Sequence, residues 1–551
     1  MVCRSLFIRT LEILFFSLCS LIFGIFALTA LNEAEDRRRP RVVLLTVESL
    51  RDDLVDEEST PHLLRAARTG HRFAGHRAVS GWTATNIVSL LTGLTPFASG
   101  VHTRGQSVAQ GISPPLAQLA EAGYVVEGLQ PFMAMDIYEN LGFTINSRGP
   151  DPALWLAERR REGQPFFLWY HYVNTHLPYG PEPLPADWPE DAKERLEKVR
   201  SQASILHDEV TFSREDVARI HALQRNRIRE FDRWFADFWA FWQGSGCGRD
   251  TILIVTADHG DEHGERGMTG HASTTLAGHL HEEIVRVPLF IWLPEQFAHL
   301  GSTARTGEIS SHLDIMPTIL ARLGIAPQIR LEGRDLFAAP KEPHRQTGSR
   351  PWLGMTASGG FAEPDPGRMR YFEYACLQGN WKSRLRVLAG GTELFALYDV
   401  TRDPGETIDL AASRPDIAAA HRKLLRSAIE SRVQNPIKSG PHDRNAEEGD
   451  GMLGWLRPSR SGSYSYEELA GSFILQWSGA PDRDYLLDYR AGNGRKALTG
   501  TMAVRGAMKD FGTIDRRYWQ TWIVPNSPFR LRVREADGPG RSPWLELEAR
   551  P

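Results

Sequence analysis

The chain has 551 residues, of which 24% are charged, 41% are hydrophobic and four are cysteine. This composition is typical of a globular protein with a large core, and it excludes repeat arrays, acidic tails and disulfide scaffolds. The 64 basic and 68 acidic residues give a net charge of −4. The chain therefore lacks the broad basic field of a general nucleic-acid binder, and we expect no nucleic-acid partner.

An apolar run at residues 13–31 is long enough to cross a bilayer and follows two arginines. We therefore expect residues 1–40 to anchor the protein to a membrane by a single N-terminal span, or to leave a secreted protein if the segment is cleaved as a signal peptide. Four arginines at residues 37–41 outnumber the two before the run, which does not favour export. The order of the segment, arginines followed by an apolar run, resembles a signal sequence and does favour export. We therefore expect the rest of the chain to be periplasmic or extracellular.

The four cysteines divide between the N-terminal segment and the rest of the chain. Cys3 and Cys19 lie in or before the apolar run, which leaves Cys247 and Cys376 beyond it. Two cysteines do not make a disulfide framework. Either these two pair with each other or both are free.

Short apolar, β-rich runs alternate with helical stretches beyond residue 40. Four of these runs are typical of buried strands: residues 42–47, 165–170, 251–256 and 287–293. Apolar and aromatic side chains recur at steps of three and four over residues 228–242, which predicts an amphipathic helix packed on the sheet. The alternation predicts a layered α/β domain at residues 41–434.

The composition and the pattern of the sequence change after this domain. Residues 435–455 are rich in charge and contain Gly-Pro and acidic Gly-containing stretches, which predicts a linker. Short β-rich runs follow at residues 472–477, 485–489, 519–524 and 529–533, separated by Gly and Pro. This pattern predicts a small β-sandwich-like domain at residues 456–551.

Polar residues stand after three of the predicted strands. Glu48 directly follows the first run, Asp258 and His259 follow the third, and His176 lies a few residues after the second. Ligands of open α/β sheets bind beyond the carboxyl ends of the strands, where these side chains should meet. An Asp-His pair alone is more often a cap or turn, but two carboxylates and an imidazole suit a divalent ion. We expect Glu48, Asp258 and His259 to bind zinc, manganese or calcium.

Thr83 begins a predicted helix that ends at Gly93. The start of a helix gathers free amides and a positive dipole, which suit an alkoxide and also a phosphate or sulfate group. Thr83 is either simply the N-cap of this helix or, if it coordinates the metal, an activated nucleophile.

In their order along the chain, these motifs resemble the sulfatases of the alkaline phosphatase superfamily over about residues 41–425. The resemblance implies an alkaline-phosphatase-like α/β/α fold with a mixed, mostly parallel sheet. It also implies metal ligands at Glu48, Asp258 and His259, and a substrate-contacting histidine at His176.

The resemblance places the nucleophile ten residues before the Gly of a Leu-x-Thr-Gly segment, and 93 − 10 = 83 gives Thr83. Sulfatases carry a CxPSR segment at this place, and its Cys becomes formylglycine. This chain instead has Thr-Ala-Thr-Asn-Ile at residues 83–87, so no formylglycine can form there. A Thr nucleophile is similar to that of the phosphoethanolamine and phosphoglycerol transferases of the superfamily, which form a phospho-threonine intermediate. The same resemblance implies that Thr83 is also a metal ligand in this chain.

A further histidine follows from the same comparison. The phosphoethanolamine transferases carry a histidine thirteen residues after the metal-binding Asp, and 258 + 13 = 271 gives His271. We expect His271, with His176, to stabilise the transferred group or to protonate the leaving group. His263, His279 and His281 compete for this role, and we expect His263 and His281 to be solvated or to stand behind the ligands.

These observations predict a metal-dependent, sulfatase-like hydrolase of phosphoric, phosphonic or sulfuric esters that forms a phospho-threonine intermediate on Thr83. The expected partner is a phospho- or sulfo-ester of a lipid or glycan. One alternative is a transferase that acts on envelope lipids or glycans, although those enzymes usually carry several membrane spans. The other is a catalytically silent scaffold that binds a polysaccharide or lipid head group.

Overall fold

The computed structural model describes residues 39–433 and, beyond residue 450, strands only. Within residues 39–433 the description has gaps at 103–107, 109–114, 130–140, 142–143, 147–150, 181–182, 202–209, 272–278, 298, 300–303, 339–349 and 359–369. The predicted anchor at residues 1–40 and linker at residues 435–455 lie almost wholly outside the described residues. In the described part, no helix combines the length and the apolar character needed to cross a bilayer.

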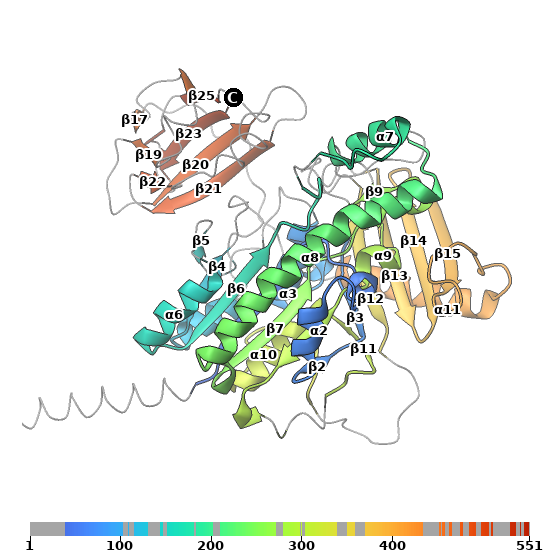
Figure 1. The fold of residues 1–551 in the computed structure, drawn as a ribbon, viewed down its shortest axis with the longest axis horizontal. Coiled ribbons are helices and arrows are strands. Elements are labelled where there is room, and N and C mark those ends of the chain that lie inside the picture. The colour runs from blue at the N-terminus through green and yellow to red at the C-terminus, as the bar shows by residue number, and fades with distance from the viewer. Residues whose placement is uncertain are drawn as a thin grey trace, which may run out of the picture.

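A seven-stranded sheet lies at the centre of the α/β domain, in the order β2-β10-β7-β1-β6-β4-β5 (Figure 1). Its strands are β1 (Arg41–Val47), β2 (His71–Arg72), β4 (Val125–Leu129), β5 (Thr144–Asn146), β6 (Phe166–Tyr172), β7 (Thr251–Ala257) and β10 (Leu289–Trp292). The strands from β7 to β5 are parallel, β10 is antiparallel to β7, and β2 is antiparallel to β10. The predicted mixed, mostly parallel sheet is therefore confirmed.

The sequence of β1 shows why both faces of this sheet must be covered. All seven residues of β1 are buried. Because successive side chains of a strand point to opposite faces, Val42 and Leu44 pack into one hydrophobic cluster and Val43 and Leu45 into another. A strand that is apolar on both faces is stable only between two layers of helices.

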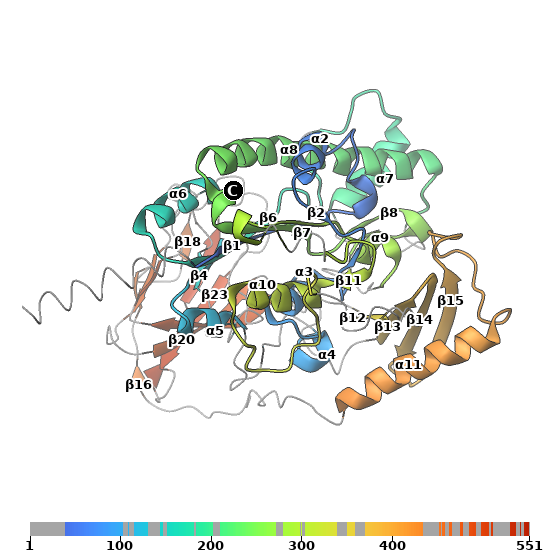
Figure 2. The same ribbon diagram turned by 90° about the horizontal axis from the view of Figure 1, so that it is seen from below.

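Two helical layers provide this cover, and Figure 2 shows the sheet between them. One layer contains α2 (Pro61–Ala67), α6 (Pro152–Glu162) and α8 (Arg214–Gly244), and the other contains α3 (Thr83–Thr92), α5 (Pro115–Glu121) and α10 (Ile315–Leu323). The predicted amphipathic helix is α8, which buries Ile228, Phe231, Phe235, Phe238 and Trp242 against the sheet. A capping box of Ser213 and Asp216 begins it.

Smaller elements surround this core. They are η1 (Asp52–Leu54), β3 (Gly75–Arg77), α4 (Pro96–Ser99), α7 (Glu190–Ser201), η3 (Cys247–Arg249), β8 (Glu262–His263), η4 (Glu265–Gly267), β9 (Thr269–Gly270), α9 (Glu282–Val285), β11 (Ile309–Ser311) and η6 (His312–Asp314). The hairpin of β8 and β9 and the short helix α9 follow β7 along the chain, so they lie close to its carboxyl end.

A second, antiparallel sheet completes the α/β part. It contains β12 (Trp352–Ala357), β13 (Tyr371–Gln378), β14 (Trp381–Leu388) and β15 (Glu393–Asp399). Helix α11 (Pro415–Val433) packs on this sheet, where Leu425 joins Cys376 and Leu385 in one apolar cluster. Cys376 and Cys247 are both buried and free, which resolves the alternative left open by the sequence.

The described strands beyond residue 450 form two further sheets. One has seven strands, β16 (Gly451–Met452), β18 (Gly462–Tyr464), β20 (Asp484–Ala491), β21 (Leu498–Arg505), β23 (Phe529–Glu535), β24 (Gly540–Arg541) and β25 (Leu545–Ala549). The other has three, β17 (Trp455–Arg457), β19 (Ile474–Trp477) and β22 (Met508–Asp510). The prediction of a β-rich C-terminal part is confirmed, whereas its boundary at residue 456 stays a prediction.

The packing of α8 on the sheet generates the first prediction. Phe235 is 0% exposed and lies between α8 and the strands, so Phe235→Ala should lower the free energy of unfolding by about 3–5 kcal/mol. Leu154 on α6 is 61% exposed, and Leu154→Ala should change it by less than about 0.5 kcal/mol. Chemical denaturation of both variants measures the difference. Equal losses would contradict the placement of α8 over the sheet.

Candidate functional site

The predicted site begins where three adjacent parallel strands end. The register pairs Val47 at the end of β1 with Tyr172 on β6 and with Ala257 on β7. Glu48 therefore lies beside the end of β6, where its N–H donates to Tyr172 O at 2.9 Å. Asp258 follows β7 on the other side, and its N–H lies 3.4 Å from Val47 O. The sheet thus brings the two predicted carboxylates together.

His259 completes this group and has the tautomer that a metal ligand needs. Its Nδ1 donates to Gly260 O at 2.8 Å, so in the neutral ring Nε2 carries a lone pair. His259 Nε2 lies 3.4 Å from Glu48 Oε1 and 3.3 Å from Asp258 Oδ2. All three side chains are completely buried.

One carboxylate oxygen of this group has no hydrogen-bond partner in the described part of the chain. Asp258 Oδ1 accepts hydrogen bonds from the N–H groups of Ser49 and His259, at 3.0 and 2.9 Å, but Asp258 Oδ2 accepts none. A buried carboxylate oxygen left unsatisfied is costly. An oxygen in this state beside a second carboxylate and an imidazole lone pair fits a divalent cation, so the residues present suit the predicted metal.

The two carboxylates differ in how readily they ionise. Burial, and then the charge of Glu48, raises the pKa of Asp258 to about 6. Burial also raises the pKa of Glu48, but the hydrogen bond from His171 and the charges of His176, His171 and His259 outweigh it and hold that pKa well below its ordinary value. Glu48 is therefore the permanent anion of the site, and a cation would stabilise the ionised form of Asp258 as well.

His171 is a residue of the site that the sequence analysis missed. Its Nε2 lies 2.9 Å from Glu48 Oε2, and its Nδ1 lies 2.7 Å from Thr46 Oγ1. Trp169 Nε1 donates to the same hydroxyl at 2.9 Å and so holds the Thr46 side chain beside the His171 ring. His171 then donates from Nε2 to Glu48 and fixes the direction of that carboxylate. A histidine inside an otherwise apolar buried strand was the available signal.

Thr83 lies where its hydroxyl meets two of these groups. Thr83 Oγ1 is 3.2 Å from Glu48 Oε1 and 3.0 Å from His259 Nε2. Trp82 occupies the N-cap of α3 and Thr83 is the first helical residue, so the interpretation of Thr83 as a simple N-cap is wrong. Asn86 holds the preceding loop in place, because its Oδ1 accepts from the N–H groups of Val79 and Ser80.

The two remaining predicted histidines stand next to this cluster. The ring centroid of His271 lies 4.0 Å from that of His259 and 5.0 Å from that of His176. His271 Nδ1 lies 2.7 Å from Asp261 Oδ1, and Asp261 Oδ2 accepts from Tyr179 Oη at 2.7 Å. Asp261 therefore orients His271, although the sequence analysis did not single it out. Burial, and then the charge of His259, lowers the pKa of His271 to about 4, so the ring is neutral at pH 7.

Two of the competing histidines, His263 and His281, are buried and not solvated. His263 stands behind the ligands, which was the other place expected of it, whereas His281 does not. His263 Nδ1 lies 3.1 Å from His221 Nδ1 and 3.2 Å from Arg51 Nη1, in a layer behind the site. His281 belongs to a separate cluster with His279.

The contact of His171 with Glu48 generates the second prediction. His171→Ala should weaken binding of a divalent ion about 10- to 100-fold, because the Glu48 carboxylate loses the donor that orients it. His171→Gln can still donate to Glu48 and should recover part of the affinity. Titration of metal-free protein, followed by calorimetry, compares the variants. Unchanged affinity in His171→Ala would show that Glu48 needs no orienting donor.

Part of the chain is similar to known sulfatases and their relatives. Residues 152–325 match the family described as Sulfatase. Over 210 residues the chain is 27% identical to the "Multifunctional alkaline phosphatase superfamily protein PehA" of Trinickia caryophylli, which covers 33% of this chain and 39% of the relative. Over 186 residues it is 31% identical to the "Delta 4,5-hexuronate-2-O-sulfatase" of Bacteroides thetaiotaomicron, which covers 32% and 34%. The match thus spans less than half the length of either relative.

Solved structures with the same fold cover more of the chain. The phosphonate monoester hydrolase of Agrobacterium radiobacter has a TM-score of 0.51 at 20% identity and covers 72% of this chain and 96% of its own. A putative sulfatase from Bacteroides thetaiotaomicron has a TM-score of 0.54 at 17% identity and covers 77% and 98%. At these identities the likeness shows a common fold.

Proposed function

We propose that this chain, whose residues 152–325 match the Sulfatase family, is a metal-dependent hydrolase of phosphoric, phosphonic or sulfuric esters with Thr83 as its nucleophile. The observation that carries the proposal is the place of the Thr83 hydroxyl, 3.2 Å from Glu48 and 3.0 Å from His259. A hydroxyl among two carboxylates and an imidazole has surroundings in which it can be activated.

Glu48, Asp258 and His259 would hold one divalent ion, with Thr83 Oγ1 as a further ligand. Zinc, manganese and calcium all remain compatible with two carboxylates and one imidazole. When bound, the ion would lower the pKa of the Thr83 hydroxyl and polarise a non-bridging oxygen of the ester. His171 keeps Glu48 turned toward the ion by donating to its other oxygen.

The chemistry on Thr83 has two halves. In the first, Thr83 Oγ1 would release its proton to solvent and form a bond to phosphorus or sulfur in line with the leaving oxygen. The bond between that atom and the leaving oxygen would break, and the leaving oxygen would take a proton from solvent or from His176 or His271. In the second, water attacks the modified Thr83, releases the acid and restores the hydroxyl. Because Thr83 is the first residue of α3, the positive end of that helix faces the negative charge that develops in both halves.

His176 and His271 would stabilise the equatorial oxygens or protonate the leaving group. Asp261 accepts from His271 Nδ1 and so favours the charged form of this ring. A bound anionic ester would act in the same direction and raise the low pKa of His271, so that the ring gains a proton as substrate binds. Tyr179 holds the second oxygen of Asp261 and keeps this pair aligned.

The Thr nucleophile favours phosphorus over sulfur, because the formylglycine route of sulfatases needs a cysteine at the position where this chain has Thr83. It also favours the second candidate function, transfer of the phosphoryl substituent to an alcohol of an envelope lipid or glycan. Both candidates share the first half of the reaction and differ only in whether water or an alcohol attacks Thr83.

We also propose that the enzyme acts on esters outside the cytoplasm. Residues 1–40 would anchor it to the membrane or release it after cleavage, and a lipid or glycan ester would be its substrate. One relative, the hexuronate sulfatase of Bacteroides thetaiotaomicron, supports a glycan ester.

The third prediction concerns Thr83. Thr83→Ala should reduce turnover by at least about 10³-fold, because the hydroxyl that would form the intermediate is lost, while metal binding weakens only in part. Thr83→Ser keeps the hydroxyl and should retain substantial activity. Matched aryl phosphate, phosphodiester, phosphonate and sulfate esters would be assayed with both variants.

A phosphorus ester should be the best of these substrates. Turnover by Thr83→Ala close to that of the natural chain would overturn the nucleophile assignment. If the natural chain binds metal but turns over none of these esters, the result would favour the catalytically silent binding scaffold.

A further inference from the structure

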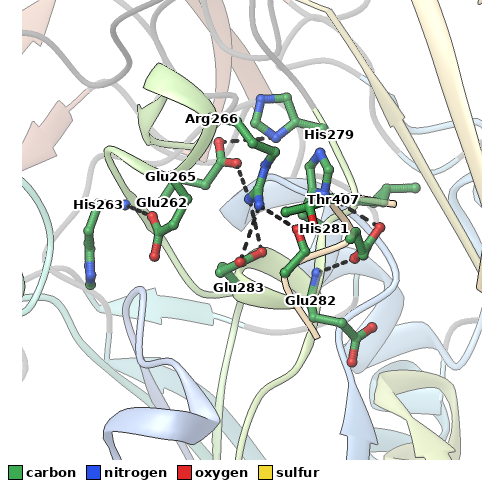
Figure 3. Close-up of polar contacts among 12 residues, drawn as sticks. Glu262, His263, Glu265, Arg266, His279, His281, Glu282, Glu283 and Thr407 are labelled. Atoms are coloured by element: carbon green, nitrogen blue, oxygen red, sulfur yellow. Dashed lines mark hydrogen bonds and ion pairs between the residues drawn. The ribbon is translucent and has the colours of Figure 1, made fainter. Parts of the chain in front are cut away.

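A second cluster of potential metal ligands lies apart from Thr83. Glu262 on β8 faces His279 and His281, which immediately precede α9 (Figure 3). All three side chains are buried. One ligand atom from each lies within 4.8 Å of those of the other two, and the two imidazole rings have centroids 5.4 Å apart.

The polar atoms of this cluster converge without bonding to one another. His279 Nδ1 lies 3.1 Å from Glu262 Oε2, and His281 Nδ1 lies 3.4 Å from Glu406 Oε2. Within the described ranges neither ring nitrogen makes a hydrogen bond, and Glu406 Oε2 accepts none, although Arg384 Nε lies 3.1 Å from it as an ion-pair partner. Buried polar atoms at such short distances without a hydrogen bond leave a cost that an ion between them would remove.

Neighbouring residues hold each carboxylate by its other oxygen. Arg266 donates from Nη2 to Glu262 Oε1 at 2.7 Å. Lys382 Nζ and the N–H of Glu282 donate to Glu406 Oε1, at 2.7 and 2.8 Å. The second oxygen of each carboxylate is thereby aimed at a histidine. Donors of this kind orient the ligands of metal sites.

We propose that Glu262, His279 and His281 bind a second divalent ion of the zinc class, with Glu406 as the adjacent carboxylate available for a fourth position. Two imidazole nitrogens and a carboxylate oxygen form a donor set that zinc prefers over calcium or magnesium. Because the ligands are all buried, the site is closed in the manner of structural zinc sites and takes no part in the chemistry of Thr83.

The ion would tie together segments that flank the candidate active site. Glu262 belongs to the hairpin that follows Asp258, and the backbone of Leu280 is held by Glu373 of β13 at 2.9 Å. A Cβ on Gly81 would lie 2.8 Å from His279 O, so this segment also packs against the loop before Thr83. The ion would thus stabilise the wall of the site without touching the ester.

The test counts zinc ions in the full chain. Protein stripped with a chelator would be reloaded with Zn²⁺, dialysed and analysed by mass spectrometry of the metal. We expect two equivalents in the natural chain and one in His279→Ala and in His281→Ala. Asp258→Asn is the matched control, because it removes a ligand of the first site and should keep the ion of the second.

Two results would overturn the proposal: two equivalents in both histidine variants, or no ion in Asp258→Asn. If the natural chain holds one ion that Asp258→Asn keeps and His279→Ala loses, the second site stands and zinc is excluded as the metal of the first site.

X-ray absorption of zinc-loaded Asp258→Asn provides a measurement that does not depend on the folding of the histidine variants. The spectrum should contain the scattering of two imidazoles. A zinc environment of oxygen alone would contradict the assignment.

Discussion

The structure depends on the burial of two carboxylates at the end of a parallel sheet. Glu48 and Asp258 are both completely inaccessible, and the parallel register of β1, β6 and β7 places them side by side. Like charges in a buried site repel one another, which is why the pKa of Asp258 rises to about 6 while His171 and its neighbours hold that of Glu48 low. A divalent cation would further stabilise this arrangement, and the lone pair of His259 would complete its ligands.

Residues without a chemical role position those that have one. The chain from Trp169 through Thr46 and His171 ends on Glu48, and Tyr179 with Asp261 orients His271. Both chains begin on or just after β6, so one strand supports the two halves of the site. Rigid support matters because small displacements of reacting groups cost large factors in rate.

Much of the fold follows from the sequence pattern, and part of the site does. The long apolar runs predict β1, β6, β7 and β10, whereas the short strands β2 and β5 form only because a neighbour offers a free edge. Glu48, Asp258 and His259 were found because each directly follows a strand. His171 was missed because it lies inside a strand, where only register reveals that it meets Glu48. His281 was misjudged because the carboxylate beside it, Glu406, comes from far along the chain.

The proposed mechanism requires a covalent bond between Thr83 and the transferred group. The most direct measurement is acid quenching of the enzyme during turnover of an aryl phosphodiester, followed by mass spectrometry of the peptide that contains Thr83. The account predicts a phosphoryl substituent on Thr83 that appears and decays with turnover. Turnover with no modification of Thr83 at any quench time, or with the substituent on another residue, would contradict it.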